Sequence, residues 1–178
     1  LTVVGLSARW RHAIASATSL ELGGRYDWIE TAADPGKADT DLYYAYHGLR
    51  DTSRSDADPS LSVRLTHAAS GSLSLGASLA RTTRAPDARE RYFGLRRMGS
   101  DWVGNPAVDP PTSTAAELSM TWSGAAGVLT AAAWSDWVAD YITLYQAPKL
   151  NMVPGVMNPA AQSYANVDAQ LVGASVDG

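Results

Sequence analysis

Apolar and polar side chains alternate along much of this chain. Between Ser60 and Thr82 every second residue is apolar, at Leu61, Val63 and Leu65 and then, after a break at Ala69 to Gly71, at Leu73, Leu75, Ala77 and Leu79. A period of two puts successive side chains on opposite faces of a β-strand, so the pattern predicts two strands that each have one apolar face. The short break between them predicts a tight hairpin turn.

The same alternation returns in three other stretches, Ser19 to Trp28, Ala116 to Ser123 and Ala165 to Leu171. After Gly173 the apolar residues change parity, since Ala174 and Val176 are now the apolar ones, and this predicts a β-bulge at the glycine. The stretch from Val128 to Leu144 is rich in strand-forming residues, but its parity is ambiguous near Ser135. It therefore predicts a strand, but not which of its residues face each side of the sheet.

Short and long connections alternate between these strands. The short ones lie near Arg11 to Ser16, at Ala69 to Gly71 and at Gly124 to Gly127, and the long ones lie at Thr31 to Pro59, Arg84 to Pro111 and Ala147 to Pro159. An antiparallel sheet of sequential neighbours places every second connection at the same end. The sequence thus predicts an all-β fold, an antiparallel up-and-down meander of about seven strands, with the tight turns at one end and the long loops at the other.

The residues on the two parities decide which surroundings the sheet fits. A soluble β-sandwich needs a packed core between its sheets, whereas this chain has a single Phe and its polar parity carries many Ser with Arg, Glu and Asp. An outer-membrane barrel shows the inverse arrangement, with the apolar side facing lipid, a wet lumen and aromatic residues at both interfaces. Aromatic residues stand near strand ends at Trp28, Trp122, Trp134, Trp137 and Tyr141. The pattern favours the membrane barrel, and a soluble carbohydrate-binding or adhesive β-sandwich, with Trp and Tyr stacking on sugars, is the alternative.

Composition excludes several classes of protein. The 178 residues carry 14 Lys or Arg against 18 Asp or Glu, so the net charge of −4 argues against a nucleic-acid binder. The absence of Cys excludes a disulfide scaffold, a thiolate metal site and a cysteine nucleophile. No apolar run approaches the roughly 18 residues of a membrane helix. The first ten residues lack the pattern of a signal peptide, and both ends of the chain look cut, so we expect a segment of a larger protein.

Candidate chemistry is sparse along the chain. The three histidines, His12, His47 and His67, are far apart and lack zinc-type spacing. Ser78 lies inside an alternating strand and reads as a lumen-lining residue rather than a nucleophile. The acidic pairs Asp39 with Asp41 and Asp56 with Asp58 read as solvated loop charge rather than a calcium site. Met152 and Met157 carry thioethers that suit Cu(I), although no His or Cys is near them in the sequence. We therefore expect no enzyme activity, no cofactor and no metal site.

A set of motifs in the second half of the chain resembles the β-barrel of TonB-dependent outer-membrane receptors. These are Arg84-Ala85-Pro86, a short helix capped by Asp87 and running through Phe93, Gly104-Asn105-Pro106-Ala107-Val108-Asp109-Pro110, Asp140-Tyr141-Ile142, and Tyr164 to Ala169. The prolines and the Gly-Asn turn indicate an ordered loop. Three departures are Val108 in place of Leu, Pro111 where an acidic residue is common, and the residues Ala174, Ser175, Val176 and Asp177 after Gly173, where the family continues Gly-x-Glu.

The resemblance implies that residues 1–178 are part of a 22-stranded transmembrane barrel in the outer membrane of a Gram-negative bacterium. It implies TonB-energised uptake of a siderophore-like metal chelate or similar nutrient, with outer-membrane lipid and TonB as partners, the latter through a plug domain that this sequence does not contain. A passive porin is a further alternative. The basic residues Arg89, Arg91, Arg96 and Arg97 make the loop before Pro111 locally positive and attractive to anionic chelates. We expect the substrate to contact Arg96, Arg97 and Trp102.

Overall fold

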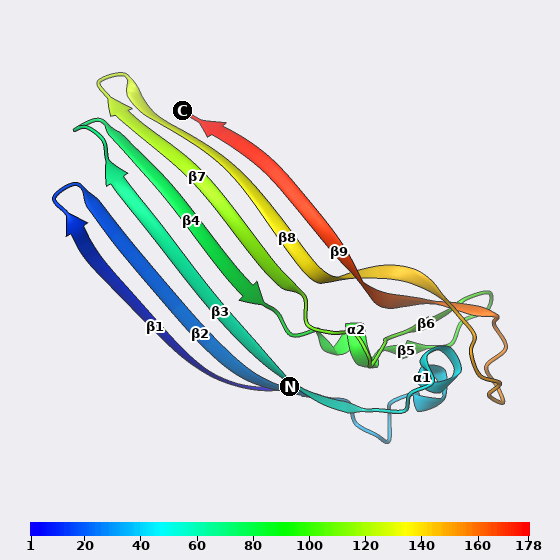
Figure 1. Ribbon diagram of the computed structural model, residues 1–178. Coiled ribbons are helices and arrows are strands. Elements are labelled where there is room, and N and C mark those ends of the chain that lie inside the picture. The colour runs from blue at the N-terminus through cyan, green and yellow to red at the C-terminus, as the bar shows by residue number, and fades with distance from the viewer.

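The computed structural model describes residues 1–178, and seven long strands dominate it (Figure 1). They are β1 (Thr2–Ala15), β2 (Thr18–Ala32), β3 (Ser53–Ala68), β4 (Leu73–Thr83), β7 (Thr112–Gly124), β8 (Gly127–Pro148) and β9 (Ala160–Asp177). Each pairs antiparallel with the next along the chain, so the predicted meander of about seven strands is confirmed.

The long connections carry the remaining elements. These are α1 (Thr40–His47) between β2 and β3, and α2 (Ala88–Tyr92), β5 (Gly94–Leu95) and β6 (Asp101–Val103) between β4 and β7. β6 pairs parallel with β9 and β5 pairs with β6, which extends the sheet to the order β1-β2-β3-β4-β7-β8-β9-β6-β5. The alternation did not predict this extension, because β5 and β6 are too short to show a period.

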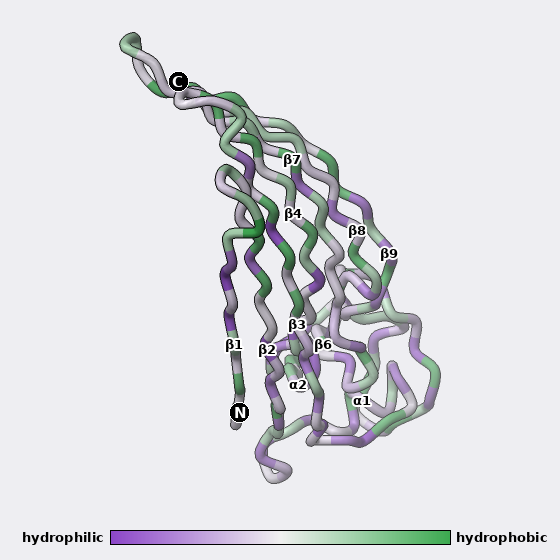
Figure 2. The backbone as a smooth tube through the Cα atoms, turned by 60° about the vertical axis from the view of Figure 1, so that its left-hand side comes forward, coloured by the Kyte–Doolittle hydropathy of each residue, from purple (hydrophilic) through white to green (hydrophobic).

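The strand register sorts the side chains onto two faces. Residues paired directly across neighbouring strands share a face. One row joins Trp10, Leu22, Val63, Leu79 and Ala116, and the row beside it on the other face joins Arg11, Glu21, Arg64, Ser78 and Glu117. The apolar and polar parities of the sequence are therefore the two faces of one sheet, which curves as a single layer (Figure 2).

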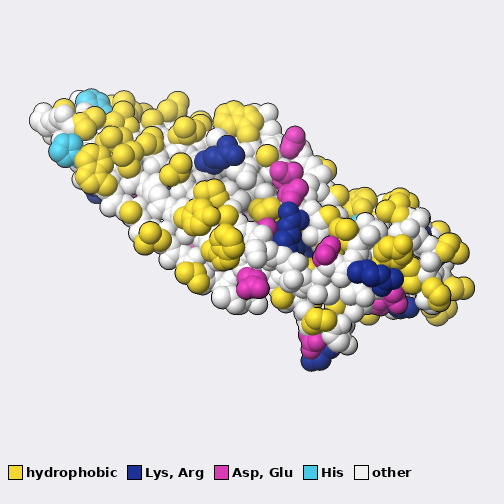
Figure 3. All heavy atoms as spheres, turned by 60° about the horizontal axis from the view of Figure 1, so that its bottom comes forward, with side chains coloured by type: hydrophobic (Ala, Val, Ile, Leu, Met, Phe, Trp, Pro, Cys, Tyr) yellow, Lys and Arg dark blue, Asp and Glu magenta, His cyan; other side chains and the backbone are white.

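No second sheet covers the apolar face. Leu61 and Leu118 on this face are 66% and 67% exposed, and hydrophobic side chains spread openly over the strands (Figure 3). Burying such side chains is the main favourable contribution to folding in water, so an open apolar face of this extent needs an apolar environment. The soluble β-sandwich is therefore wrong. None of the helices has the length and apolar character needed to cross a membrane.

Two turn positions differ from the sequence prediction. The first turn is at Ser16 and Ala17, later than the expected link near Arg11 to Ser16, because β1 continues to Ala15. β3 begins at Ser53 rather than near Ser60, which shortens the first long connection to residues 33–52. In this added part of β3 small and acidic residues, such as Ser55 and Asp56, replace the apolar alternation. The strand there is held by pairing with β2.

The predicted bulge at Gly173 is wrong. Gly173 pairs with Trp134, and the pairing of β8 with β9 shows no shift directly on either side of it. The irregularity lies instead between Val138 and Tyr141 of β8, where Asp140 has a φ of 59°. A Cβ at Gly173 would lie 2.4 Å from the Trp134 ring, so the glycine makes room for that ring. The apolar residues before and after Gly173 consequently lie on opposite faces of the sheet.

Most of the expected aromatic belt keeps to the apolar face. The register puts Trp28, Trp122 and Trp137 there, each between 40% and 54% exposed. Trp134 is the exception, since it pairs with Glu117 and so lies on the polar face. Trp134 therefore does not belong to a lipid-facing girdle. The fifth predicted aromatic residue, Tyr141, directly follows the irregularity in β8.

Candidate ligand-binding site

The three long connections fold together at the end of the sheet opposite the tight turns (Figure 1). They share the principal hydrophobic core of the molecule with the ends of β8 and β9; its residues are Leu42, Tyr43, Ala45, Tyr46, Tyr92, Val103, Ala147, Val153, Val156 and Ala161. Loops that bury a common core hold a defined shape, which is what a recognition surface needs.

α1 is the central piece of this core. Asp39 caps its first turn through Leu42 N–H, and Gly48 ends it in the left-handed conformation, with a φ of 74°. The Tyr43 hydroxyl donates to the carbonyl of Tyr92 at 2.5 Å, and the Tyr46 hydroxyl donates to the Asp101 carboxylate at 2.7 Å. Burial raises the pKa of Tyr43 to about 12. Both tyrosines thus stay neutral donors that fasten α1 to the second connection.

α2 holds the next connection to the sheet. Asp87 caps the helix, as the sequence predicted, and Glu90 completes a capping box with it. Arg91 is fully buried, and its guanidinium pairs with Asp56 of β3 and donates to the Val108 carbonyl at 3.1 Å. Breaking such a buried pair leaves an uncompensated charge. Arg91 therefore locks the Gly104 to Pro110 segment against the sheet.

The structure gives the predicted contact residues different surroundings. Arg96 forms two hydrogen bonds with the Asp39 carboxylate, at 2.7 and 2.9 Å, and one with the Gly155 carbonyl at 3.1 Å, so it joins all three connections. Its guanidinium holds the pKa of Asp39 below the usual range. Arg97 is exposed and its side chain has no ion pair, while Trp102 is half-buried in β6.

The expected positive charge of this end is largely compensated. The three connections carry eight Lys or Arg and eight Asp or Glu, and basic and acidic side chains lie beside one another there (Figure 3). Arg91 and Arg96 are paired, which leaves Arg89 and Arg97 as exposed guanidinium groups without a carboxylate partner. Lys149 also lacks a carboxylate partner and donates to the Val156 carbonyl. Attraction of an anion at this end is accordingly a local property of these side chains.

Three exposed thioethers stand on the same end. Met152 and Met157 are 89% and 85% exposed, and Met98, which the sequence reading did not single out, is fully exposed. Asn158 donates to the Arg97 carbonyl at 2.8 Å, so the loop segment that carries Met157 lies beside the one that carries Met98. What distinguishes these three residues from methionines that pack in a core is their exposure to solvent. The sequence alone does not show that exposure.

The histidines and acids are dispersed. His47 in α1 lies 2.8 Å from the Ser163 hydroxyl, and burial lowers its pKa to about 4. His12 and His67 lie on β1 and β3 near the tight turns. The acidic pairs Asp39 with Asp41 and Asp56 with Asp58 do not form a shared site either. Asp39 binds Arg96, and Asp56 binds Arg91. No group of three or more His, Cys, Asp or Glu side chains gathers in a way that would hold a metal ion.

An open sheet with a lipid-type outer face, a polar inner face and folded long connections defines an outer-membrane β-barrel wall. The family model described as TonB dependent receptor-like, beta-barrel, matches residues 2–176. The chain therefore belongs to the TonB-dependent receptor β-barrel family, whose members are β-barrel proteins of the Gram-negative outer membrane. The resemblance and the location predicted from the sequence are confirmed.

Solved structures of the same fold agree with this assignment. The copper transporter OprC superposes with a TM-score of 0.69 at 23% identity, and the match covers 97% of this chain and 25% of OprC. The hemophore receptor HasR of Serratia marcescens gives 0.66 at 21% identity, covering 97% and 30% of the two chains. The ferric enterobactin receptor PfeA gives 0.56 at 17%, covering 98% and 33%.

The chain thus spans about a quarter to a third of the length of these structures. No curated protein is similar enough in sequence to match it.

Proposed function

We propose that this chain is a wall segment of a TonB-energised receptor that takes up a metal chelate or a similar nutrient across the outer membrane. The observation that carries the proposal is the union of three long connections around one core, at one end of a sheet whose outer face is apolar and open. Such a scaffold presents a shaped surface to the outside while its strands sit in lipid. The chain does no covalent chemistry in this proposal.

The ligand-contacting role belongs to Arg97 and Trp102, with Arg96 holding the surface in shape. Arg97 presents a free guanidinium, and Arg96 is occupied by Asp39 and Gly155. An arginine can bind a carboxylate or other oxyanion of a chelate through two parallel hydrogen bonds. The half-buried Trp102 of β6 offers a flat apolar surface in the same segment, where the Arg97 backbone N–H donates to the carboxylate of the neighbouring Asp101. In the whole receptor, a plug domain would occlude a barrel of 22 strands and couple it to TonB.

The test is uptake of candidate ferric chelates by cells that carry the intact parent receptor. Arg97→Ala should weaken apparent affinity about tenfold, as loss of an arginine anchor does at binding interfaces. The matched control Arg89→Ala removes the other free guanidinium and should change affinity less than about twofold. Uptake should cease in cells that lack TonB. Uptake that persists without TonB would establish a passive porin instead, and an unchanged affinity in Arg97→Ala would remove the contact from this residue.

Copper is a second candidate cargo, favoured by Met98, Met152 and Met157. Thioethers bind Cu(I) in preference to hard cations, and three fully or nearly exposed methionines lie on two adjoining loops. Replacing the three residues with Leu keeps their volume and apolar character but removes the sulfur atoms. The triple variant should lose copper accumulation in the intact receptor and keep chelate uptake if copper is the cargo. Unchanged copper accumulation would reject this candidate.

A further inference from the structure

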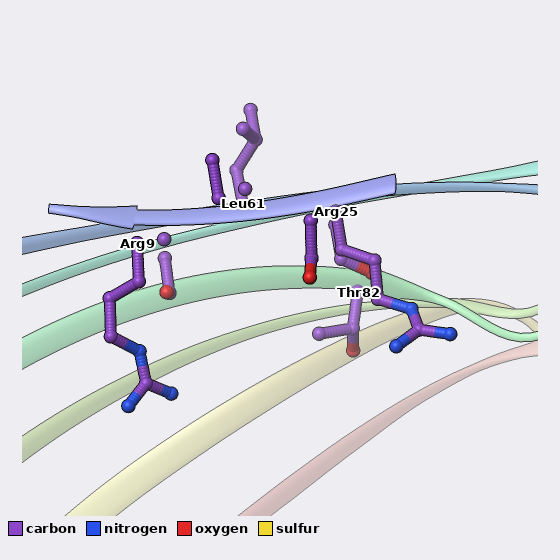
Figure 4. A pocket seen from close by; sticks show the side chains of 10 residues that line it. Arg9, Arg25, Leu61 and Thr82 are labelled. Atoms are coloured by element: carbon purple, nitrogen blue, oxygen red, sulfur yellow. The ribbon is translucent and has the colours of Figure 1, made fainter. Parts of the chain in front are cut away.

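The polar face of β1, β2, β3 and β4 contains a hollow of ≈440 Å³ that shares no residue with the core of the long connections. Residues from two neighbouring rows line it: Ser7, Arg25 and Ser60 in one, and Arg9, Gly23 and Ser62 in the other. Arg9, Arg25 and Thr82 all point to the side of the sheet opposite Leu61 (Figure 4). Leu61 belongs to the apolar face, so the hollow opens toward the bore of the barrel.

Glycines shape this hollow. Gly23 stands between Arg9 and Ser62, and a Cβ there would lie 2.6 Å from the Ser62 hydroxyl. Its missing side chain leaves room for the Ser62 hydroxyl at the floor of the hollow. A Cβ at Gly5 would meet the Asp27 carboxylate, so Gly5 leaves room for Asp27 to bind Arg25, at 2.9 Å between Nη2 and Oδ1. Arg25 is thereby held in place at one side of the hollow.

The lining of the hollow carries two arginines and no carboxylate. Glu21 binds Arg11 at 2.8 Å and lies 3.5 Å from Arg9, and Asp27 binds Arg25. Asp58 lies opposite Asp27 on the same face, so carboxylates stand around the hollow but not in its lining, and Arg9, with its side chain 78% exposed, has the most distant partner. The hydroxyls of Ser7, Ser60, Ser62 and Thr82 make no hydrogen bond to the protein, so they add free donors to the largely exposed guanidinium of Arg9.

We propose that this hollow binds a carboxylate group inside the bore. A guanidinium that forms two parallel hydrogen bonds matches the two oxygens of a carboxylate, and the hydroxyls satisfy the remaining lone pairs. The carboxylate belongs either to a free molecule in the bore or to a side chain of polypeptide lodged against the wall. The proposal rests on the bore-facing assignment of the polar face and not on which nutrient is taken up.

The experiment places a reactive thiol in the hollow of the full-length receptor. Ser62→Cys is nearly isosteric, and the chain has no Cys of its own; cysteines elsewhere in the parent are replaced first. The thiol is treated at low salt with 2-sulfonatoethyl methanethiosulfonate, an anion, or with the trimethylammonium analogue, a cation. Each reagent forms a mixed disulfide with the thiolate and releases methanesulfinate. Citrate is the carboxylate probe, compared with sodium chloride of equal ionic strength.

Three outcomes separate the cases. A free carboxylate site gives an anion preference of at least about fivefold, protection by citrate but not chloride, and loss of both in Arg9→Gln. A site filled by polypeptide gives a thiol that is inert to both reagents and becomes reactive in Arg9→Gln. Equal reaction with both reagents, no citrate protection and no effect of Arg9→Gln would overturn the proposal.

Arg64→Gln is the matched control. Arg64 lies on the same face and its guanidinium is 3.8 Å from Glu117, outside the hollow. The variant makes the same change in charge; it should lower the anion preference at low salt through its long-range field but leave the protection by citrate in place, whereas Arg9→Gln removes that protection. Insertion of every variant is checked by its heat-modifiable electrophoretic mobility. Failure of this test would leave the uptake proposal untouched, because neither reagent nor citrate reports on transport.

Discussion

Arg91 is the residue on which the folded connections depend most. It is fully buried and pairs with Asp56, which is itself almost buried. We predict that Arg91→Ala destabilises the segment from Arg84 to Pro111 by about 3–5 kcal/mol, because the buried Asp56 then keeps only Arg54, whose Nε lies 3.7 Å away, as a partner. Limited proteolysis of the intact receptor should show new cleavage in this segment.

Two further variants test whether the new cleavage comes from breaking the ion pair or merely from removing an arginine from α2. Arg89→Ala, two positions away on α2, removes a guanidinium that has no partner and should leave the cleavage pattern unchanged. The double variant Arg91→Met with Asp56→Leu removes both charges and should regain much of the protection. Equal cleavage in Arg89→Ala and Arg91→Ala would contradict the role given to the pair.

His47 makes the same region sensitive to pH. Burial lowers its pKa to about 4, below the ordinary value of about 6.5, so the unfolded region binds the proton more strongly. The docking of α1 should be at full strength above about pH 6.5. It should weaken as the pH falls toward about 4, by at most about 1.4 kcal/mol per pH unit before solvent screening reduces it.

Hydrogen exchange of residues 40–48 in the intact receptor measures this effect. Protection, corrected for the intrinsic exchange rate, should fall between pH 7.5 and pH 5. His47→Gln keeps a side-chain partner for Ser163 and should remove most of the pH dependence. A pH dependence that persists in His47→Gln would assign it to another group.

At the scale of the elements, the two faces of β7 allow a direct comparison. Leu118 lies on the apolar face, midway between Thr114 and Trp122, and Ser119 lies on the polar face beside it. We predict that Leu118→Arg costs about 2–4 kcal/mol of folding free energy in a bilayer, since it places a charge in the hydrocarbon region. Ser119→Arg should cost much less. Urea titration of the intact receptor in lipid vesicles checks both, and equal costs would contradict the assignment of faces.

The elements also show where sequence reading succeeds and where it stops. In β3, β4 and β7 one parity is apolar and the other polar, so register and face follow from the sequence. In β9 both faces carry apolar residues, and the parity change at Gly173 suggested a bulge that is absent. That glycine is required because the Trp134 ring on the neighbouring strand occupies the space of its side chain. The local sequence pattern does not show such a contact between strands.

The site was predictable only in part, for a similar reason. The sequence located the connection with Arg96, Arg97 and Trp102, but the different surroundings of the two arginines depend on Asp39 and Gly155, far away in the chain. The shared core of α1 was also hidden, since Leu42, Tyr43 and Tyr46 fall within a loop by strand periodicity. The hollow beside Arg9 is lined by residues of four strands, and no single stretch of sequence shows it.

At the scale of the whole molecule, the fold is an open curved sheet with one apolar and one polar face. Its order begins at β1 and ends at β5, so the sheet does not close on itself, and the unpaired edge of β1 has free backbone groups. Barrel closure would satisfy those groups, since closing a sheet removes its edges. The location of the apolar face in lipid and of the polar face in the bore follows from this geometry and supports every proposal above.

Spin-label accessibility along β7 in the reconstituted intact receptor measures that location most directly. Single cysteines are placed from Thr114 to Trp122, labelled, and exposed to oxygen, which concentrates in lipid, or to a water-soluble nickel chelate. We predict a period of two, with oxygen contact at Ala116, Leu118 and Met120 and low oxygen contact at Ala115, Glu117 and Ser119. Shielding of both parities from oxygen, or contact at the polar parity instead, would contradict the account.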